Sequence, residues 1–200
     1  MSNTVYTIGH STHSAEHFIR LLFEHGITAV CDVRSTPYSR MNPQFNRETL
    51  KETLKSNGIA YVFLGQELGA RSENPACYVD GKVQYSALAD EPSFIEGLKR
   101  IKQGMERYVV ALLCSEKDPL TCHRTILVCR ALRDPAISIL HISAEGELES
   151  QSVLEQRLLR TLGIKPDMFQ NEGACIERAY DQQATRIAYV RKPQSSVASR

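Results

Sequence analysis

The chain has 200 residues, of which 42% are hydrophobic and 24% are charged, and its formal net charge is +1. This composition is typical of a globular protein with a well-buried core, and it excludes a fibrous or wholly disordered chain. Because the sequence contains no long run of Lys and Arg, it lacks the basic stripe typical of proteins that bind duplexes, and the net charge gives nucleic-acid binding no support.

The first predicted elements along the chain alternate between strand and helix. One helix begins after the N-cap residue Ser14 and ends before Gly26, and Leu50 and Leu54 share one face of a second helix. The elements predicted in this part are strands at residues 5–9, 27–33 and 59–64 and helices at residues 15–25 and 46–57.

The alternation continues after a loop-rich stretch between Gly65 and about Tyr85. A helix that begins at Ser86 or Asp90 and ends at Gln103 comes first. It is followed by strands at residues 108–114 and 137–142 and by helices at residues 119–132 and 150–162. The last stretch, residues 192–200, is Ser-rich and polar, and we expect it to be disordered.

Five nearly continuous apolar strands that alternate with helices indicate strands buried on both faces. We therefore expect an α/β fold with a parallel or mostly parallel sheet of about five strands, helices on both faces and three layers. Residues 1–191 are expected to form a single domain. In such sheets the loops that follow the strands meet at the carboxyl edge, where open α/β sheets bind ligands.

The sequence predicts a cytoplasmic protein without a membrane partner. Residues 1–9 contain no basic segment followed by a long apolar one, and the longest apolar run, residues 109–114, is too short to cross a bilayer. The six cysteines form no Cys-x-x-Cys pair. This pattern favours reduced thiols over disulfides and argues against a structural zinc site.

Polar residues follow each predicted strand, and the loop after residues 108–114 is the most informative. Asp118 and Pro119 are the residue types favoured at the N-cap and first position of a helix. Cys122, His123 and Arg124 then fall in the opening turns, where free backbone N–H groups and the helix dipole favour an anion. The same field lowers the pKa of a nearby thiol, which would activate Cys114 or Cys122.

Several of these residues have structural explanations that the sequence leaves open. Asp32 and Arg34 lie on the same face of a strand and form either an ion pair or part of a substrate site. Cys31 and Cys129 are better explained as small buried hydrophobic residues. His123 is a candidate base or metal ligand, or else a capping or packing residue.

Known phosphate-binding motifs are absent from the sequence. Nine residues separate Cys114 from Arg124, and this stretch lacks the glycines of a short loop that wraps one anion, as in cysteine phosphatases. Walker-type and dinucleotide-type glycine motifs are missing as well.

Five segments together resemble the domain of unknown function 488 family, a bacterial and archaeal group. They are Thr7-Ile8-Gly9-His10-Ser11, Asp32-Val33-Arg34 with Pro37 and Arg40, Asn42-Pro43-Gln44-Phe45, Leu64 to Gly69, and Leu113 to Arg124 with His141-Ile142 downstream. The resemblance covers about residues 4–190 and implies an α/β fold, but it brings no established activity. One departure is Gly69-Ala70-Arg71, where many members have Gly-Gly before the Arg.

We favour an enzyme, a hydrolase or transferase, that acts on a small anionic substrate such as a nucleotide or another phosphorylated compound. The candidate catalytic residues are Cys114, Glu116, Cys122, His123 and His10. The candidate substrate-binding residues are Ser11, Asp32, Arg34, Arg40, Arg71 and Arg124. This hypothesis assigns no metal ligand and names no cofactor, and it leaves a homo-oligomer open.

Two alternatives remain at this stage. The first is a metal-binding enzyme that holds zinc or iron with Cys114, Cys122 and His123; adjacent positions on a regular helix point about 100° apart, which makes joint ligation by Cys122 and His123 awkward. The second is a non-enzymatic module that binds nucleotides or nucleic-acid ends, with Tyr78 and Tyr85 as stacking aromatics. The loop that carries these tyrosines is better explained as a lid or dimer contact.

Overall fold

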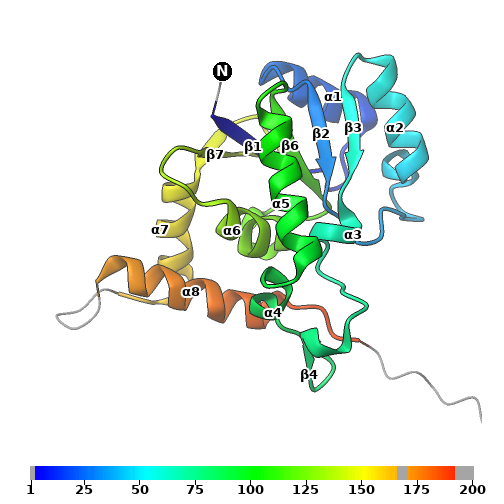
Figure 1. The fold of residues 1–200 in the computed structure, drawn as a ribbon. Coiled ribbons are helices and arrows are strands. Elements are labelled where there is room, and N and C mark those ends of the chain that lie inside the picture. Colours follow the sequence, from blue (N-terminus) through cyan, green and yellow to red (C-terminus); the bar gives the residue numbers. More distant parts are fainter. Residues whose placement is uncertain (1–2, 166–170, 192–200) are drawn as a thin grey trace, which may run out of the picture.

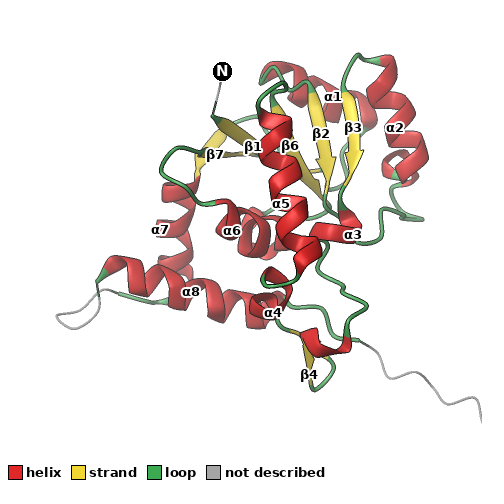
Figure 2. Ribbon diagram, viewed as in Figure 1, coloured by secondary structure: helices red, strands yellow, loops and turns green. Residues whose placement is uncertain are grey.

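The computed structural model describes residues 3–165 and 171–191, and it confirms the predicted α/β fold. A six-stranded, mostly parallel sheet has the order β3-β2-β6-β1-β7-β8 (Figures 1 and 2). Only β8 runs antiparallel to its neighbour, β7. The strands are β1 Thr4–Gly9, β2 Ala29–Asp32, β3 Ala60–Phe63, β6 Val110–Cys114, β7 Ser138–Ile142 and β8 Leu148–Ser150.

Helices cover both faces of the sheet and bury two separate apolar clusters. The helices are α1 Ala15–Glu24, α2 Arg47–Ser56, α3 Gly65–Leu68, α4 Tyr85–Ala89, α5 Pro92–Met105, α6 Arg130–Leu132, α7 Gln151–Leu162 and α8 Glu172–Ile187. Phe18 of α1 and Leu54 of α2 pack on one face. Phe94 of α5, Leu132 of α6 and Leu154 of α7 pack on the other face, as Figure 1 shows for α5 and α6.

The strand register sets the position of the carboxyl edge. Gly9 of β1 lies opposite Cys114 of β6, and Asp32 of β2 lies opposite Leu113. Since the three strands are parallel and neighbouring, the loops that follow them begin side by side. The sequence predicted this meeting of loops, and the register confirms it.

The predicted regular helix over residues 119–132 is wrong. A 3₁₀ turn, Pro119–Thr121, begins with Asp118 as its cap, but Cys122 then has an extended backbone with φ −126° and ψ 136°. A π-helical segment, Arg124–Cys129, follows and leads into α6. Cys122 therefore precedes the main helix instead of lying within its first turn. Such π-helical segments are found frequently at functional sites.

The sequence did not predict α8, β8 or the small elements of the loop-rich stretch. That stretch contains α3, a 3₁₀ turn at Pro75–Cys77 and the hairpin β4 Tyr78–Val79 with β5 Lys82–Val83. The helix predicted from Ser86 or Asp90 to Gln103 is divided into α4 and α5. Helix α8 crosses below the sheet, on the side toward which β2 and β3 point (Figure 1). Its Gln183 donates to the carbonyl of Leu120 at 2.7 Å, and the amide of Val83 donates to the carbonyl of Tyr189 at 2.9 Å. The chain after α8 is thereby held against the hairpin.

Among residues 3–165 and 171–191, no helix has the length and apolar character needed to cross a membrane. The polar tail predicted at residues 192–200 lies outside the described residues.

Candidate functional site

The loop after β6 packs directly on the end of β1. The amide of His10 donates to the carbonyl of Cys114, and the amide of Ser11 donates to the carbonyl of Ser115, both at 2.9 Å. Gly9 permits this approach, since a Cβ atom at that position would lie 1.9 Å from the carbonyl oxygen of Glu116. The glycine therefore fixes where the side chains of Cys114 and Glu116 emerge at the edge.

Four predicted catalytic side chains form one group, which we call the thiol cluster: Cys114, Glu116, Cys122 and His123. The Sγ atoms of Cys114 and Cys122 each lie 3.0 Å from Oε2 of Glu116, and Nδ1 of His123 lies 3.5 Å from Sγ of Cys114. Nε2 of His123 donates to the carbonyl of Val33 at 2.9 Å. This bond leaves the lone pair of Nδ1 directed at the thiols.

Arg124 supplies a buried positive charge behind the thiol cluster. Its side chain is 0% exposed, and Nη1 donates to the carbonyl of Glu116 at 2.7 Å while Nε lies 3.4 Å from the hydroxyl of Thr7. Its Nη2 has no hydrogen-bond partner within the described part of the chain. A buried guanidinium needs a compensating negative charge, and the thiol cluster is where this chain provides one.

Electrostatics within the thiol cluster favour ionisation of Cys122 over ionisation of Cys114. Burial opposes ionisation, but the hydrogen bond from Cys114 and the charge of Arg124 hold the pKa of Cys122 well below its ordinary value. Burial, reinforced by Cys122, raises the pKa of Cys114 well above its ordinary value. Burial and the neighbouring Cys122 also raise the pKa of Glu116. Ionisation is therefore favoured at Cys122 over Cys114 and Glu116.

A cavity of about 210 Å³ opens onto the thiol cluster. Cys114, Glu116 and His123 line it, together with Arg34 and Arg71. Cys122 does not line this cavity. The remaining lining residues are Ser35, Thr36, Ala70, Tyr85, Ser115, Thr121, Ile187 and Tyr189. The lining of the cavity therefore combines reactive residues with two arginines.

Arg34 forms an ion pair with Asp32 and also lines the cavity. Nε and Nη2 of Arg34 donate to the two carboxylate oxygens of Asp32 at 2.8 and 2.6 Å, and the hydroxyl of Tyr61 donates to Asp32 at 2.8 Å. Asp32 is 0% exposed and does not line the cavity. The ion pair that the sequence left open is therefore present, and Asp32 positions Arg34 at the cavity.

His10, Ser11 and Arg40 lie outside the cavity. The ring of His10 is buried and stacks on Phe45 with centroids 4.4 Å apart, and its Nδ1 donates to the carbonyl of Ser11 at 2.9 Å. Burial, with help from the charge of Arg34, lowers the pKa of His10 to about 4, so the ring is neutral near pH 7. Arg40 is exposed on the loop after β2. These positions separate the three residues from the lining of the cavity.

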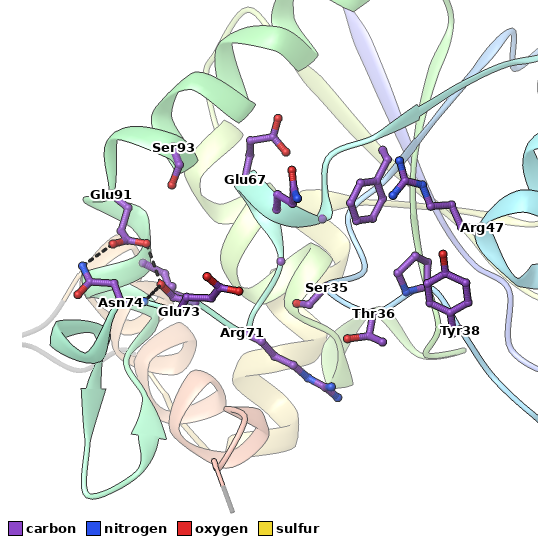
Figure 3. A pocket seen from close by; sticks show the side chains of 17 residues that line it. Ser35, Thr36, Tyr38, Arg47, Glu67, Arg71, Glu73, Asn74, Glu91 and Ser93 are labelled. Atoms are coloured by element: carbon purple, nitrogen blue, oxygen red, sulfur yellow. Dashed lines mark hydrogen bonds between the residues drawn. The ribbon is translucent and has the colours of Figure 1, made fainter.

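A larger groove of about 600 Å³ adjoins the cavity and shares Ser35, Thr36 and Arg71 with it. Figure 3 shows this groove with Tyr38 and Arg47 at one end and with Asn74 and Glu91 at the other. It contains none of the cysteines. Its size therefore does not make it the reactive centre, although it extends the space open to a ligand.

Sequence analysis missed the residues that the C-terminal segment brings to the cavity. Ile187 and Tyr189 line it, and Arg71 lies over the ring of Tyr189 at 4.5 Å. Asn171, which caps α8, and the spacing of Cys175, Ala179 and Tyr180 on one buried face are the signals that could have revealed this helix.

A family model described as "Domain of unknown function DUF488" matches residues 14–131. The chain belongs to the DUF488 family. The DUF488 match contains the thiol cluster, Arg34 and Arg71, while His10 and Ser11 precede it and the segment with Ile187 and Tyr189 follows it. No curated protein and no solved structure matches the chain. DUF488 membership confirms the resemblance seen in the sequence and assigns no activity.

Proposed function

We propose that this DUF488 protein is an enzyme, a hydrolase or transferase, that acts on a small anionic substrate at the thiol cluster. One observation carries the proposal: the cavity places Cys114, Glu116 and His123 beside Arg34 and Arg71 at the carboxyl edge of the sheet. Ligands of open α/β sheets bind at this edge. Reactive side chains that face a cavity together with cationic ones are typical of an active site.

The charge of the cavity favours an anionic substrate. Guanidinium groups bind phosphates and carboxylates, and Arg34 and Arg71 come from two different loops. Because Nε and Nη2 of Arg34 donate to Asp32 and to the carbonyl of Phe45, we assign paired hydrogen bonds to the ligand to Arg71 and charge to Arg34. Arg34 is 4% exposed and held by Asp32, so its position is fixed before a ligand binds. Arg71 is exposed and rests on Tyr189, so it can follow the ligand. Fully buried Arg124 supports the cluster from behind instead of contacting the substrate.

The side chains at the cavity floor supply groups for covalent and proton-transfer chemistry. A thiol beside an imidazole is the arrangement of a cysteine nucleophile with its base. The bond from His123 to the carbonyl of Val33 fixes its tautomer, so that Nδ1 can accept a proton. Glu116, in contact with both thiols, is a second proton carrier. The proposal requires only that the reacting atom of the substrate lies next to Cys114.

Calorimetric titration with inorganic phosphate, pyrophosphate and nucleoside monophosphates tests this proposal. We expect one of these anions to bind the wild type, and we expect Arg71→Ala to weaken binding by at least about tenfold, as the loss of one charged hydrogen bond would. Arg40→Ala is the matched control, because Arg40 is exposed and lies outside the cavity. Equal binding by the two variants would remove the anion site from this cavity.

Turnover separates an enzyme from a binding module. Phosphate-ester and acyl-ester substrates should be consumed by the wild type, and the rate should fall by at least about 100-fold in Cys114→Ala. Anion binding that depends on Arg71 without turnover of any ester would instead support a non-enzymatic module and overturn the enzyme assignment.

A further inference from the structure

We propose that Cys114, Cys122 and His123 form a zinc site whose open side faces the cavity. The side chains offer two sulfurs and one imidazole nitrogen, a ligand set that catalytic zinc sites combine with a fourth position for water or substrate. Zinc binding at this site does not depend on the proposed function. A catalytic role for the zinc ion rests on the proposed function.

The distances between ligand atoms fit one metal ion. The donor atoms of Cys114, Cys122 and His123 all lie within 4.8 Å of one another. Bond lengths of about 2.3 Å to sulfur and about 2.1 Å to nitrogen place neighbouring ligands of a tetrahedral zinc about 3.6 Å apart. The 3.5 Å between Sγ of Cys114 and Nδ1 of His123 matches this edge. Glu116 lies 3.0 Å from each sulfur but outside this group of three ligand atoms, so it is a neighbour of the site and not one of its ligands.

The backbone removes the objection to adjacent ligands. On a regular helix Cys122 and His123 would point about 100° apart. Here Cys122 is extended, with φ −126° and ψ 136°, and His123 has a helical backbone with φ −62° and ψ −27°. This break before the π-helical segment directs both side chains toward Cys114.

The surroundings of the ligands are those of a prepared metal site. Metal-binding histidines usually donate their second ring nitrogen to a carbonyl or carboxylate, and Nε2 of His123 donates to the carbonyl of Val33 at 2.9 Å. Two thiolates and the carboxylate of Glu116 carry three negative charges, which Zn²⁺ and the guanidinium of Arg124 together neutralise. The Nη2 atom of Arg124, fully buried and without a partner in the described residues, is a free donor next to these charges.

The position of the cavity favours a catalytic zinc over a closed structural one. Cys114, Glu116 and His123 line the cavity, so one side of the ion faces the space between Arg34 and Arg71. A catalytic zinc keeps a fourth position for water or substrate, which three protein ligands leave open here. When bound, zinc would polarise an oxygen of the anionic substrate or activate a water molecule.

Metal analysis of the full chain, purified without a polyhistidine tag, tests the inference. We expect about one zinc per chain after reconstitution with ZnCl₂ and dialysis, and we expect Cys122→Ala and Cys114→Ala to weaken zinc binding by at least about 100-fold. Cys129→Ala is the matched control, because Cys129 is as fully buried as Cys122 and close to it in sequence but lies outside the cluster. Binding by Cys122→Ala that equals binding by Cys129→Ala would overturn the site.

Cobalt substitution of the wild type keeps the test valid if the cysteine variants fail to fold. Cobalt bound by two thiolates gives strong sulfur-to-cobalt absorption in the near ultraviolet and tetrahedral bands in the visible range. A folded wild type without these bands contradicts the zinc site. Arg71-dependent anion binding in such a protein would leave the proposed function standing, whereas bound zinc without anion binding or turnover would refute the proposed function alone.

Discussion

Gly9→Ala is predicted to disrupt both the fold and the thiol cluster. The new Cβ atom would lie 1.9 Å from the carbonyl oxygen of Glu116, whereas ordinary contact begins at 3.4 Å, and it would lie 3.0 Å from Nη1 of Arg124. The loop after β6 must therefore move away, and the 2.7 Å bond from Arg124 to that carbonyl is lost. Overpacking and the loss of this charged hydrogen bond together lower the free energy of unfolding by about 3–5 kcal/mol.

Urea unfolding of purified wild type and variant measures this effect. Gly104→Ala is the control. Gly104 lies in helix α5, and a Cβ atom at this position would meet only Cγ2 of Val110, at 3.7 Å. This control should raise the free energy of unfolding by about 0.5–1 kcal/mol, since alanine favours a helix over glycine. A loss below about 1 kcal/mol in Gly9→Ala would refute the packing of the loop against β1 and, with it, the position of Glu116.

Three further changes test neighbouring parts of the structure. Arg124→Met should lower the free energy of unfolding by about 3–5 kcal/mol, because it leaves buried negative charge uncompensated, while exposed Arg40→Met should change it by less than about 0.5 kcal/mol. Tyr189→Ala removes the ring beneath Arg71. In a calorimetric titration this variant should bind the anion about two- to fivefold more weakly than the wild type. Unchanged affinity would mean that the C-terminal segment does not support Arg71. Burial lowers the pKa of His141 to about 4, so the unfolded chain binds more protons than the folded one. This histidine alone should lower the free energy of unfolding by about 3 kcal/mol as pH drops from 6.5 to 4, and His10 should add a similar loss. In urea unfolding across this range, His141→Gln should remove about half of the slope that the two histidines produce.

The environment of His141 explains the direction of that pH dependence. Its Nδ1 accepts from the hydroxyl of Thr7 at 2.8 Å, and its Nε2 donates to Oε1 of Gln151 at 2.8 Å. Both bonds suit the neutral ring. Arg124 and Arg157 oppose a positive charge there and Glu149 favours it, but burial outweighs these charges.

The sheet could be predicted from the sequence because its five parallel strands are apolar runs that alternate along the chain with helical segments. Strand β6, with all of Val110–Cys114 buried, gave the strongest signal. The antiparallel strand β8, residues Leu148–Ser150, was missed because it is short and only partly buried. Helix α8 was missed although Asn171 caps it and one face is buried.

The sequence predicted which residues form the candidate site better than it predicted the arrangement of those residues. Parallel strand order was enough to bring Cys114, Arg34 and Arg71 to one edge. Which of the polar residues enter the cavity depends on loop packing, which has no periodic signal: Arg124 turned out fully buried, and His10 stacks on Phe45. The extended residue Cys122 arises from tertiary packing as well, since Asp118 and Pro119 signal the start of a regular helix.

A crystal structure of the chain grown with zinc and pyrophosphate, with anomalous data at the zinc edge, tests the account most directly. We predict an anomalous peak bonded to Sγ of Cys114, Sγ of Cys122 and Nδ1 of His123, with pyrophosphate held by Arg34 and Arg71 in the cavity beside it. Pyrophosphate bound elsewhere, with no zinc among these three atoms, would contradict the assignment of this edge of the sheet as the functional site.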